Sequence, residues 1–210
     1  MSKKTALVLG DTTQAHWHFM NAAEPYIRET LEENYELTFS EAYPDMTAAL
    51  LNQYDLVINY ADNWGERGTV PAGVALLDFV ANGGQLLTIH SGIITPNAKF
   101  LLQMHGGKFL RHADYATLNY KTLGNHPVTE GVGSFSMGEE PYEYELALFS
   151  EREPVLEFEL NGTIYPAGWV IPYGLGRIVY LQPGHDARSF AVPEFQKLIK
   201  NSALWLCPTI

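Results

Sequence analysis

The sequence has a single cysteine, few positive charges and no long hydrophobic run. Cys207 has no partner for an internal disulfide, and its place in the C-terminal tail makes it an improbable nucleophile. Thirteen Lys and Arg against 24 Asp and Glu give a net charge of −11. Such an acidic surface repels phosphate backbones and anionic lipids. No apolar run reaches the roughly 18 residues of a membrane span. We therefore expect neither a nucleic acid nor a membrane as a partner.

Motifs for phosphate binding and secretion are also missing. Neither G-x-G-x-x-G nor G-x-x-x-x-G-K-[ST] occurs, and Gly174-Leu-Gly176 precedes a predicted strand rather than a helix N-terminus. We expect no nucleotide cofactor. The first residues enter a predicted strand without the pattern of a signal peptide, so a cytoplasmic location is expected.

The first half of the chain alternates between short apolar runs and amphipathic segments. The runs at 5–10, 35–40, 55–60 and 85–89 predict strands, and the segments at 19–33, 46–52 and 71–82 predict helices. Alternation of this kind is typical of a parallel sheet with right-handed crossovers. We predict an α/β fold, a doubly wound three-layer sandwich with a mostly parallel sheet, in one domain over residues 1–210.

The second half predicts an antiparallel addition to this sheet. The runs 155–160 and 163–165 flank Asn161-Gly162, the strongest short signal for a β-hairpin. Further strands are expected at 116–121 and 177–181, and a closing helix is expected from Pro193 to about Leu206.

Several histidines follow predicted strands, and parallel sheets bind ligands at the carboxyl ends of their strands. His16 and His18 follow the first strand, His90 follows the fourth, and His185 follows the strand at 177–181. We predict that His90, His185 and Glu140 are catalytic. A divalent metal, Zn or Mn, would be held by His16, His18, His90 and His185. The alternative, that single loop histidines only cap turns, stays open, and we favour it for His105 and His126.

The segment Leu86-Leu-Thr-Ile-His90-Ser-Gly92 is built like a nucleophile elbow, a sharp turn from a buried strand into a helix. An elbow needs Cys or Ser at its tip, and here the tip is His90. This residue could act as a base, a hydrogen-bond donor or a metal ligand. It is a poor nucleophile for amide transfer.

Aromatic side chains fall in predicted loops at the same rim. Trp17, Trp64 and Tyr142, together with the carboxylate of Asp186, are suited to the apolar faces and hydroxyl edges of a sugar. Ordinary packing remains the alternative for each aromatic residue. Because aromatic residues are numerous and some would be exposed, a homo-oligomer is also expected.

Seven segments occur in an order that resembles the ThuA-like (trehalose utilisation) family: 82–91, 105–112, 125–131, Glu139-Glu-Pro-Tyr142, 165–169, 173–180 and Gly184-His-Asp186. The resemblance implies a flavodoxin-like fold similar to class I glutamine amidotransferases, with His90 in the place of their cysteine. It also implies a role in carbohydrate metabolism, on sugars oxidised to 3-keto forms. Glu139 stands where the family usually has Asp.

Three functions follow from these residues. The first is an enzyme of hydrolase or lyase type that cleaves a small-molecule sugar or glycoside, with histidines or a metal handling the developing charge. The second is a non-catalytic module that binds a small molecule on an amidotransferase-like scaffold. The third, a glutamine amidotransferase, is disfavoured because the elbow has no cysteine.

Overall fold

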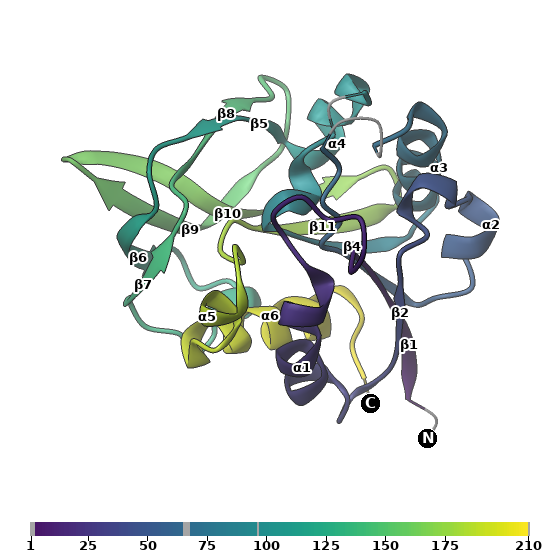
Figure 1. Cartoon of the computed structure of the whole chain (residues 1–210), viewed down its shortest axis with the longest axis horizontal. Coiled ribbons are helices and arrows are strands. Elements are labelled where there is room, and N and C mark those ends of the chain that lie inside the picture. The colour runs from purple at the N-terminus through teal and green to yellow at the C-terminus, as the bar shows by residue number, and fades with distance from the viewer. Residues whose placement is uncertain (1–2, 65–67, 96, 210) are drawn as a thin grey trace.

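A computed structural model describes residues 3–64, 68–95 and 97–209 (Figure 1). Within this part of the chain the main sheet has nine strands. In spatial order they are β2 (Tyr35–Ser40), β1 (Lys4–Leu9), β3 (Leu56–Asn59), β4 (Gln85–Ile89), β11 (Gly176–Leu181), β10 (Thr163–Tyr173), β9 (Glu153–Leu160), β6 (Ala116–Thr122) and β7 (Phe135–Glu139). A separate antiparallel pair is formed by β5 (Gly107–His112) and β8 (Tyr142–Leu146).

The pairing changes from parallel to antiparallel halfway across the main sheet. The strands from β2 to β11 pair in parallel. The strands from β11 to β7 pair antiparallel. This confirms the predicted α/β fold, and the antiparallel addition is larger than the predicted hairpin. The hairpin itself turns at Asn161 and Gly162, with φ of 52° and 77°, as a type I′ turn requires.

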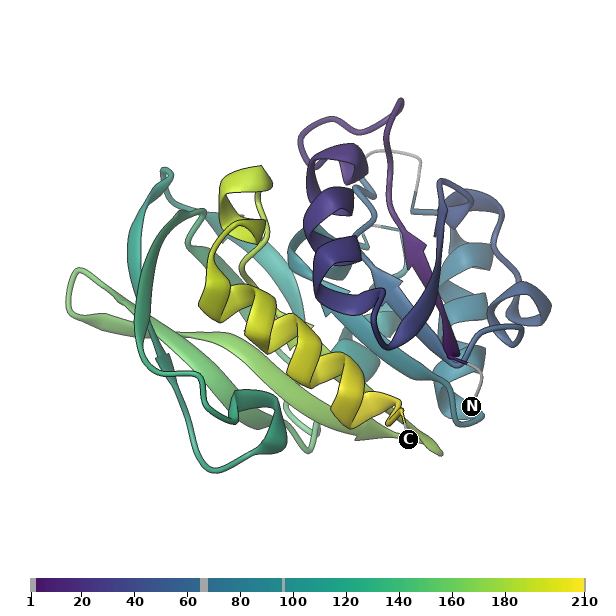
Figure 2. The same ribbon diagram turned by 90° about the horizontal axis from the view of Figure 1, so that it is seen from below.

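Helices cover both faces of the sheet, which gives three layers (Figures 1 and 2). The helices are α1 (Met20–Leu31), α2 (Ala48–Leu51), α3 (Val70–Ala81), α4 (Leu102–His105), α5 (Ala187–Phe190) and α6 (Pro193–Leu206). Short 3-10 turns are η1 (Tyr43–Asp45), η2 (His90–Ile93), η3 (Lys99–Leu101) and η4 (Pro127–Thr129). None of the described helices is both long and apolar enough to cross a membrane.

The two faces of the sheet bury different side chains of the same strands. On β1, Ala6 and Val8 pack with α1 and α6, whereas Leu7 and Leu9 pack with α2 and α3. Alternate residues of a strand point to opposite faces, so a strand covered on both sides must be apolar throughout. That is why the parallel strands appear in the sequence as continuous apolar runs.

The end of β4 is a sharp turn. His90 has a φ of 45°, in the left-handed region that few non-glycine residues adopt. Two residues later, a Cβ on Gly92 would overlap the backbone oxygen of Asn59 on β3, so only glycine fits there. The turn places the His90 side chain at the carboxyl edge of the parallel strands, in the position expected of an elbow residue.

Candidate functional site

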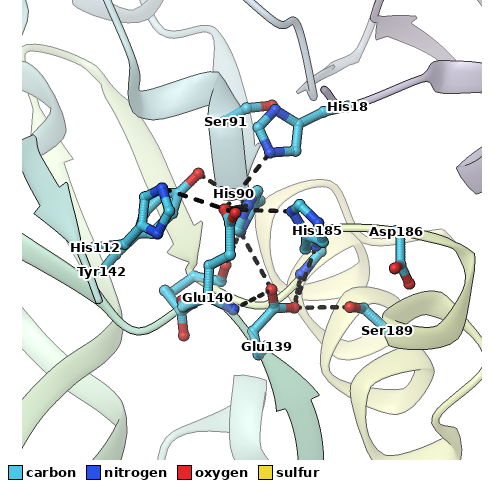
Figure 3. Close-up of polar contacts among 12 residues, drawn as sticks. His18, His90, Ser91, His112, Glu139, Glu140, Tyr142, His185, Asp186 and Ser189 are labelled. Atoms are coloured by element: carbon cyan, nitrogen blue, oxygen red, sulfur yellow. Dashed lines mark hydrogen bonds and ion pairs between the residues drawn. The ribbon is translucent and has the colours of Figure 1, made fainter. Parts of the chain in front are cut away.

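Three imidazoles and one carboxylate converge at the carboxyl edge of the parallel strands (Figure 3). His18, His90, His185 and Glu140 each offer one ligand atom, and these atoms all lie within 4.8 Å of one another. Oε2 of Glu140 is 3.3 Å from Nδ1 of His185, 3.4 Å from Nε2 of His90 and 3.8 Å from Nε2 of His18. We call these four residues the His/Glu group. They come from four separate segments of the chain.

Hydrogen bonds fix the tautomers of two of these histidines. Nδ1 of His90 lies 2.6 Å from the carbonyl oxygen of Gln182, so it carries the proton and Nε2 keeps its lone pair. Nδ1 of His18 lies 3.2 Å from Oδ1 of Asp62, which has the same effect. A ring nitrogen held in this way by a carboxylate or a carbonyl is the usual arrangement of a metal-ligating histidine.

Asp62 also fixes the loop that carries His18. Its Oδ2 accepts hydrogen bonds from the backbone N–H groups of His16, Trp17 and His18, at 2.7, 2.8 and 3.4 Å. The backbone N–H of Asp62 donates in turn to the buried carboxylate of Asp11, 3.0 Å away. The carboxylate that follows β3 thereby anchors the loop that follows β1.

Glu139 has the equivalent role for the loop of His185. It is fully buried, and its Oε2 accepts from the backbone N–H groups of Gly184 and His185 and from the hydroxyl of Ser189, at 2.7, 3.2 and 2.7 Å. Figure 3 shows this carboxylate directly below the loop. Glu139 thus positions His185, and Glu140 enters the His/Glu group.

Three carboxylates at the site have no lysine or arginine partner among the described residues. Among the described residues, the ion-pair contacts of Asp62, Glu139 and Glu140 are all to histidines. Burial alone would raise the pKa of Glu140, but its contacts with His18, His185 and His90 outweigh burial and hold that pKa far below its usual range. Burial lowers the pKa of His18, but Asp62 and Glu140 raise it above its ordinary value. These carboxylates favour a cation among the three rings.

Two ring nitrogens of the group are buried without a hydrogen bond among the described residues, Nε2 of His18 and Nδ1 of His185. A buried polar atom without a hydrogen bond costs about 1–3 kcal/mol, and one ion bound by both nitrogens would remove this cost. Ligands at ~2.0–2.1 Å around a tetrahedral ion lie about 3.3 Å apart. The distances from Glu140 to His185 and His90, 3.3 and 3.4 Å, are close to this value, and the other ligand atoms, up to 4.8 Å apart, would move slightly closer around an ion. The residues therefore fit a divalent ion.

Of the other residues expected at the site, all within the described part of the chain, only Tyr142 contacts the His/Glu group directly through its side chain. His16 is exposed and outside the His/Glu group. Trp17 is 67% exposed. Asp186 caps α5 and pairs with Arg188 at 2.5 Å. Trp64 lines a neighbouring pocket, and the hydroxyl of Tyr142 lies 2.8 Å from Nε2 of His90.

One residue near the group was not expected from the sequence. His112 ends β5 directly across the ladder from Tyr142, and its Nε2 is 3.8 Å from Oε1 of Glu140. Its Nδ1 lies 2.9 Å from the carbonyl oxygen of Ala113, so Nε2 carries the lone pair. His112 is 39% exposed, whereas His18 and His90 are buried. Only the pairing of β5 with β8 brings it here, and neither strand was predicted.

His105 and His126, for which we favoured a structural role, lie outside the His/Glu group. His126 accepts a hydrogen bond from the backbone N–H of Val128 at 3.1 Å, at the start of η4. His105 is 1% exposed, and neither of its ring nitrogens has a partner among the described residues. Burial lowers the pKa of His105 from 6.5 to about 4.

We expect His105 to make the protein less stable in acid. In the unfolded chain His105 binds a proton below about pH 6.5, whereas in the folded protein it binds one only below about pH 4. The free energy of unfolding is therefore at its full value above pH 6.5 and decreases as the pH falls from 6.5 to 4. The loss amounts to about 3 kcal/mol. Urea unfolding at pH 7 and pH 4.5 should show a smaller difference for His105→Leu than for wild type. The exposed His16→Gln should behave as wild type, and an unchanged pH dependence in His105→Leu would contradict the prediction.

Fold and site together define the class. This is a three-layer α/β protein with a fold similar to glutamine amidotransferases, and its His/Glu group lies at the carboxyl edge of the parallel strands. The only cysteine is at the other end of the sheet, where its carbonyl oxygen accepts from the hydroxyl of Tyr35 at the start of β2.

The chain belongs to the ThuA family, described as trehalose utilisation, whose profile matches residues 5–206. This membership supports a carbohydrate-related role and confirms the resemblance seen in the sequence. A comparison with curated proteins finds no match.

Solved structures with the same fold include ThuA-like proteins. One from Bacteroides uniformis superposes with a TM-score of 0.79 at 18% identity, over 97% of this chain and 91% of that one. One from Parabacteroides merdae gives 0.77 at 15% identity, over 98% and 90%. PurLQS from Thermotoga maritima gives 0.62 at 14% identity, over 98% and 100%. At such identities these likenesses concern the fold.

Proposed function

We propose that this protein is a metal-dependent enzyme that cleaves a sugar glycoside, with 3-keto glycosides as the substrate class that the family resemblance implies. The observation that carries the proposal is the His/Glu group, in which two buried ring nitrogens lack hydrogen bonds. His18, His90, His185 and Glu140 would hold Zn²⁺ or Mn²⁺, since imidazole and carboxylate ligands suit both ions. When bound, the ion would act as a Lewis acid toward the ketone oxygen of the sugar.

The residues around the group supply positioning and proton transfer. Asp62, Gln182 and Glu139 keep His18, His90 and His185 in orientation through the hydrogen bonds described above. His112, which is partly exposed, directs the lone pair of its Nε2 toward Glu140. Tyr142 places its phenol hydroxyl beside Nε2 of His90. If Nε2 of His90 held the ion, the Tyr142 hydroxyl would lose this acceptor and could donate to another oxygen.

These positions fit an elimination that begins next to the ketone. Nε2 of His112 takes the proton from C2 of a 3-keto sugar. The electron pair of the broken C–H bond forms a double bond between C1 and C2, and the C1–O bond breaks toward oxygen. The departing oxygen takes a proton from the Tyr142 hydroxyl or from water. The products are an alcohol and an unsaturated keto sugar.

Metal analysis of the purified protein tests the proposal. We expect about one Zn or Mn per chain, reduced to less than about a tenth in His185→Gln because a site that loses one ligand binds far more weakly. His16→Gln changes a histidine outside the group, in the loop that carries His18, and should retain the metal. Equal metal content in wild type and His185→Gln would contradict the assignment.

A non-catalytic binding module is the second candidate, because fold alone does not dictate activity. It would bind a sugar tightly without turnover and without stoichiometric metal. Glutaminase activity has no cysteine at the elbow to support it.

A further inference from the structure

A mostly apolar pocket of about 360 Å³ is lined in part by Ile93 of η2, the turn that begins at His90. This size is in the range of small-molecule sites. Its apolar lining consists of Trp64, Ile93, Ile94, Leu102, Phe109 and Leu110. The remaining described lining residues are a threonine, Thr95, and two lysines, Lys99 and Lys108.

Two lining residues, Ile93 and Phe109, connect the pocket to the neighbourhood of the His/Glu group. Ile93 closes the short turn η2 that begins at His90. The ring of Phe109 lies 5.7 Å from that of Trp64, inside the pocket. The same ring lies 4.5 Å from Tyr142 and 6.0 Å from His112, both beside Glu140. A ligand that extends from the His/Glu group past Phe109 therefore enters the pocket.

The chemistry of the lining does not suit a second sugar. Sugar hydroxyls need acceptors, and no carboxylate or amide side chain is among the described lining residues. Aromatic and aliphatic walls instead favour a flat apolar group. Nε1 of Trp64 is buried with no hydrogen-bond partner among the described residues, so it can donate to a substituent on that group.

The two lysines favour a negative charge on the ligand. Lys108 is neutralised by Glu145, 2.7 Å away. Lys99, on η3, makes no ion pair within the described part of the chain. In a protein of net charge −11, this exposed lysine in the lining of an apolar pocket provides a local positive charge that could attract an anion.

We propose that this pocket binds the leaving group of the substrate, and that this leaving group is an aromatic alcohol with an anionic substituent such as a carboxylate. The substrates are then aryl glycosides rather than disaccharides. The assignment rests on the proposed function for the position of the sugar, but the pocket can be tested without the metal.

The first experiment probes the pocket with 8-anilinonaphthalene-1-sulfonate, an anionic aromatic dye. We expect dye binding to weaken about tenfold in Leu110→Asp and about fivefold in Lys99→Glu. Leu110 and Lys99 are both exposed, so neither change should prevent folding. Matched controls are Leu148→Asp, at a leucine 89% exposed outside the lining, and Lys197→Glu on α6, at an exposed lysine that also makes no ion pair among the described residues. Equal binding by Leu110→Asp and wild type would overturn the pocket assignment.

The second experiment displaces the dye with glycosides. The 4-carboxyphenyl glucosides, as α and β anomers, should displace it at about a tenth of the concentration that methyl glucosides require. Equal displacement by both types would overturn the assignment, even if the metal is present and the proposed function stands. Selective displacement from a protein that lacks metal would support the pocket and reject the metal-dependent mechanism.

Discussion

Replacing His90 with Asn is expected to abolish turnover of 3-keto glucosides, by about a thousandfold or more, because a bound cation contributes several kcal/mol to stabilising the transition state. Asn tolerates the left-handed backbone conformation that His90 adopts, so the variant removes a ligand without changing the backbone of the turn. Ala at this φ would add backbone strain, so the loss of the ligand could not be separated from a loss of stability. The measurement is the release of alcohol from the substrate, together with metal content.

The stability of this variant separates a site residue from a structural one. His90 is fully buried and its Nδ1 donates to Gln182, so we expect His90→Asn to cost about 1–2 kcal/mol of unfolding free energy. That is too little to unfold an ordinary domain. His16→Asn is the control and should keep both activity and metal. If His90→Asn turns over substrate at the wild-type rate, the site does not act through the His/Glu group.

The convergence of His90 and His185 on one edge could be predicted from the sequence for a simple geometric reason. Each follows an apolar run, and parallel strands covered by helices end at the same edge of the sheet. In the structure β4 and β11 are parallel neighbours, and Ile89 and Leu181 are directly paired. The residues that follow these strands therefore begin side by side, and short loops give the imidazoles little freedom to separate.

The choice between His16 and His18 could not be made from the sequence. Both follow β1 in a loop, and local spacing does not say which ring turns inward. Three consecutive backbone N–H groups, beginning at His16, bind the carboxylate of Asp62 from another strand, and only His18 is then buried. A contact across 44 residues thus decides which ring enters the group.

The antiparallel half was harder to predict for a related reason. β5 and β8 are short and half-exposed, so neither has a strong hydrophobic pattern, and their paired residues are 30 to 39 positions apart in the sequence. Their pairing places His112 opposite Tyr142 and thereby next to Glu140. The sequence contains both residues, but the sheet that brings them together depends on tertiary contacts.

Replacing His112 with Ala is expected to lower kcat for 3-keto glycosides by about 10²–10⁴-fold, the usual contribution of a positioned general base. Because Nδ1 of His112 donates to Ala113, Nε2 is the nitrogen that accepts the substrate proton. His112 is not one of the four residues that would hold the ion, so metal content should stay at the wild-type level. Its ring is 39% exposed, so the free energy of unfolding should change little.

Chemical rescue distinguishes a base from a residue that only shapes the site. Removing the exposed ring of His112 leaves a space open to solvent, and added imidazole should enter it and restore part of the lost rate. The rescued rate should rise with the concentration of neutral imidazole. The His90→Asn variant offers the matched comparison, since its buried position is closed to added imidazole and its defect is the loss of a ligand. A full loss of metal in His112→Ala, or a rate that imidazole leaves unchanged, would place His112 among the residues that build the site rather than those that move the proton.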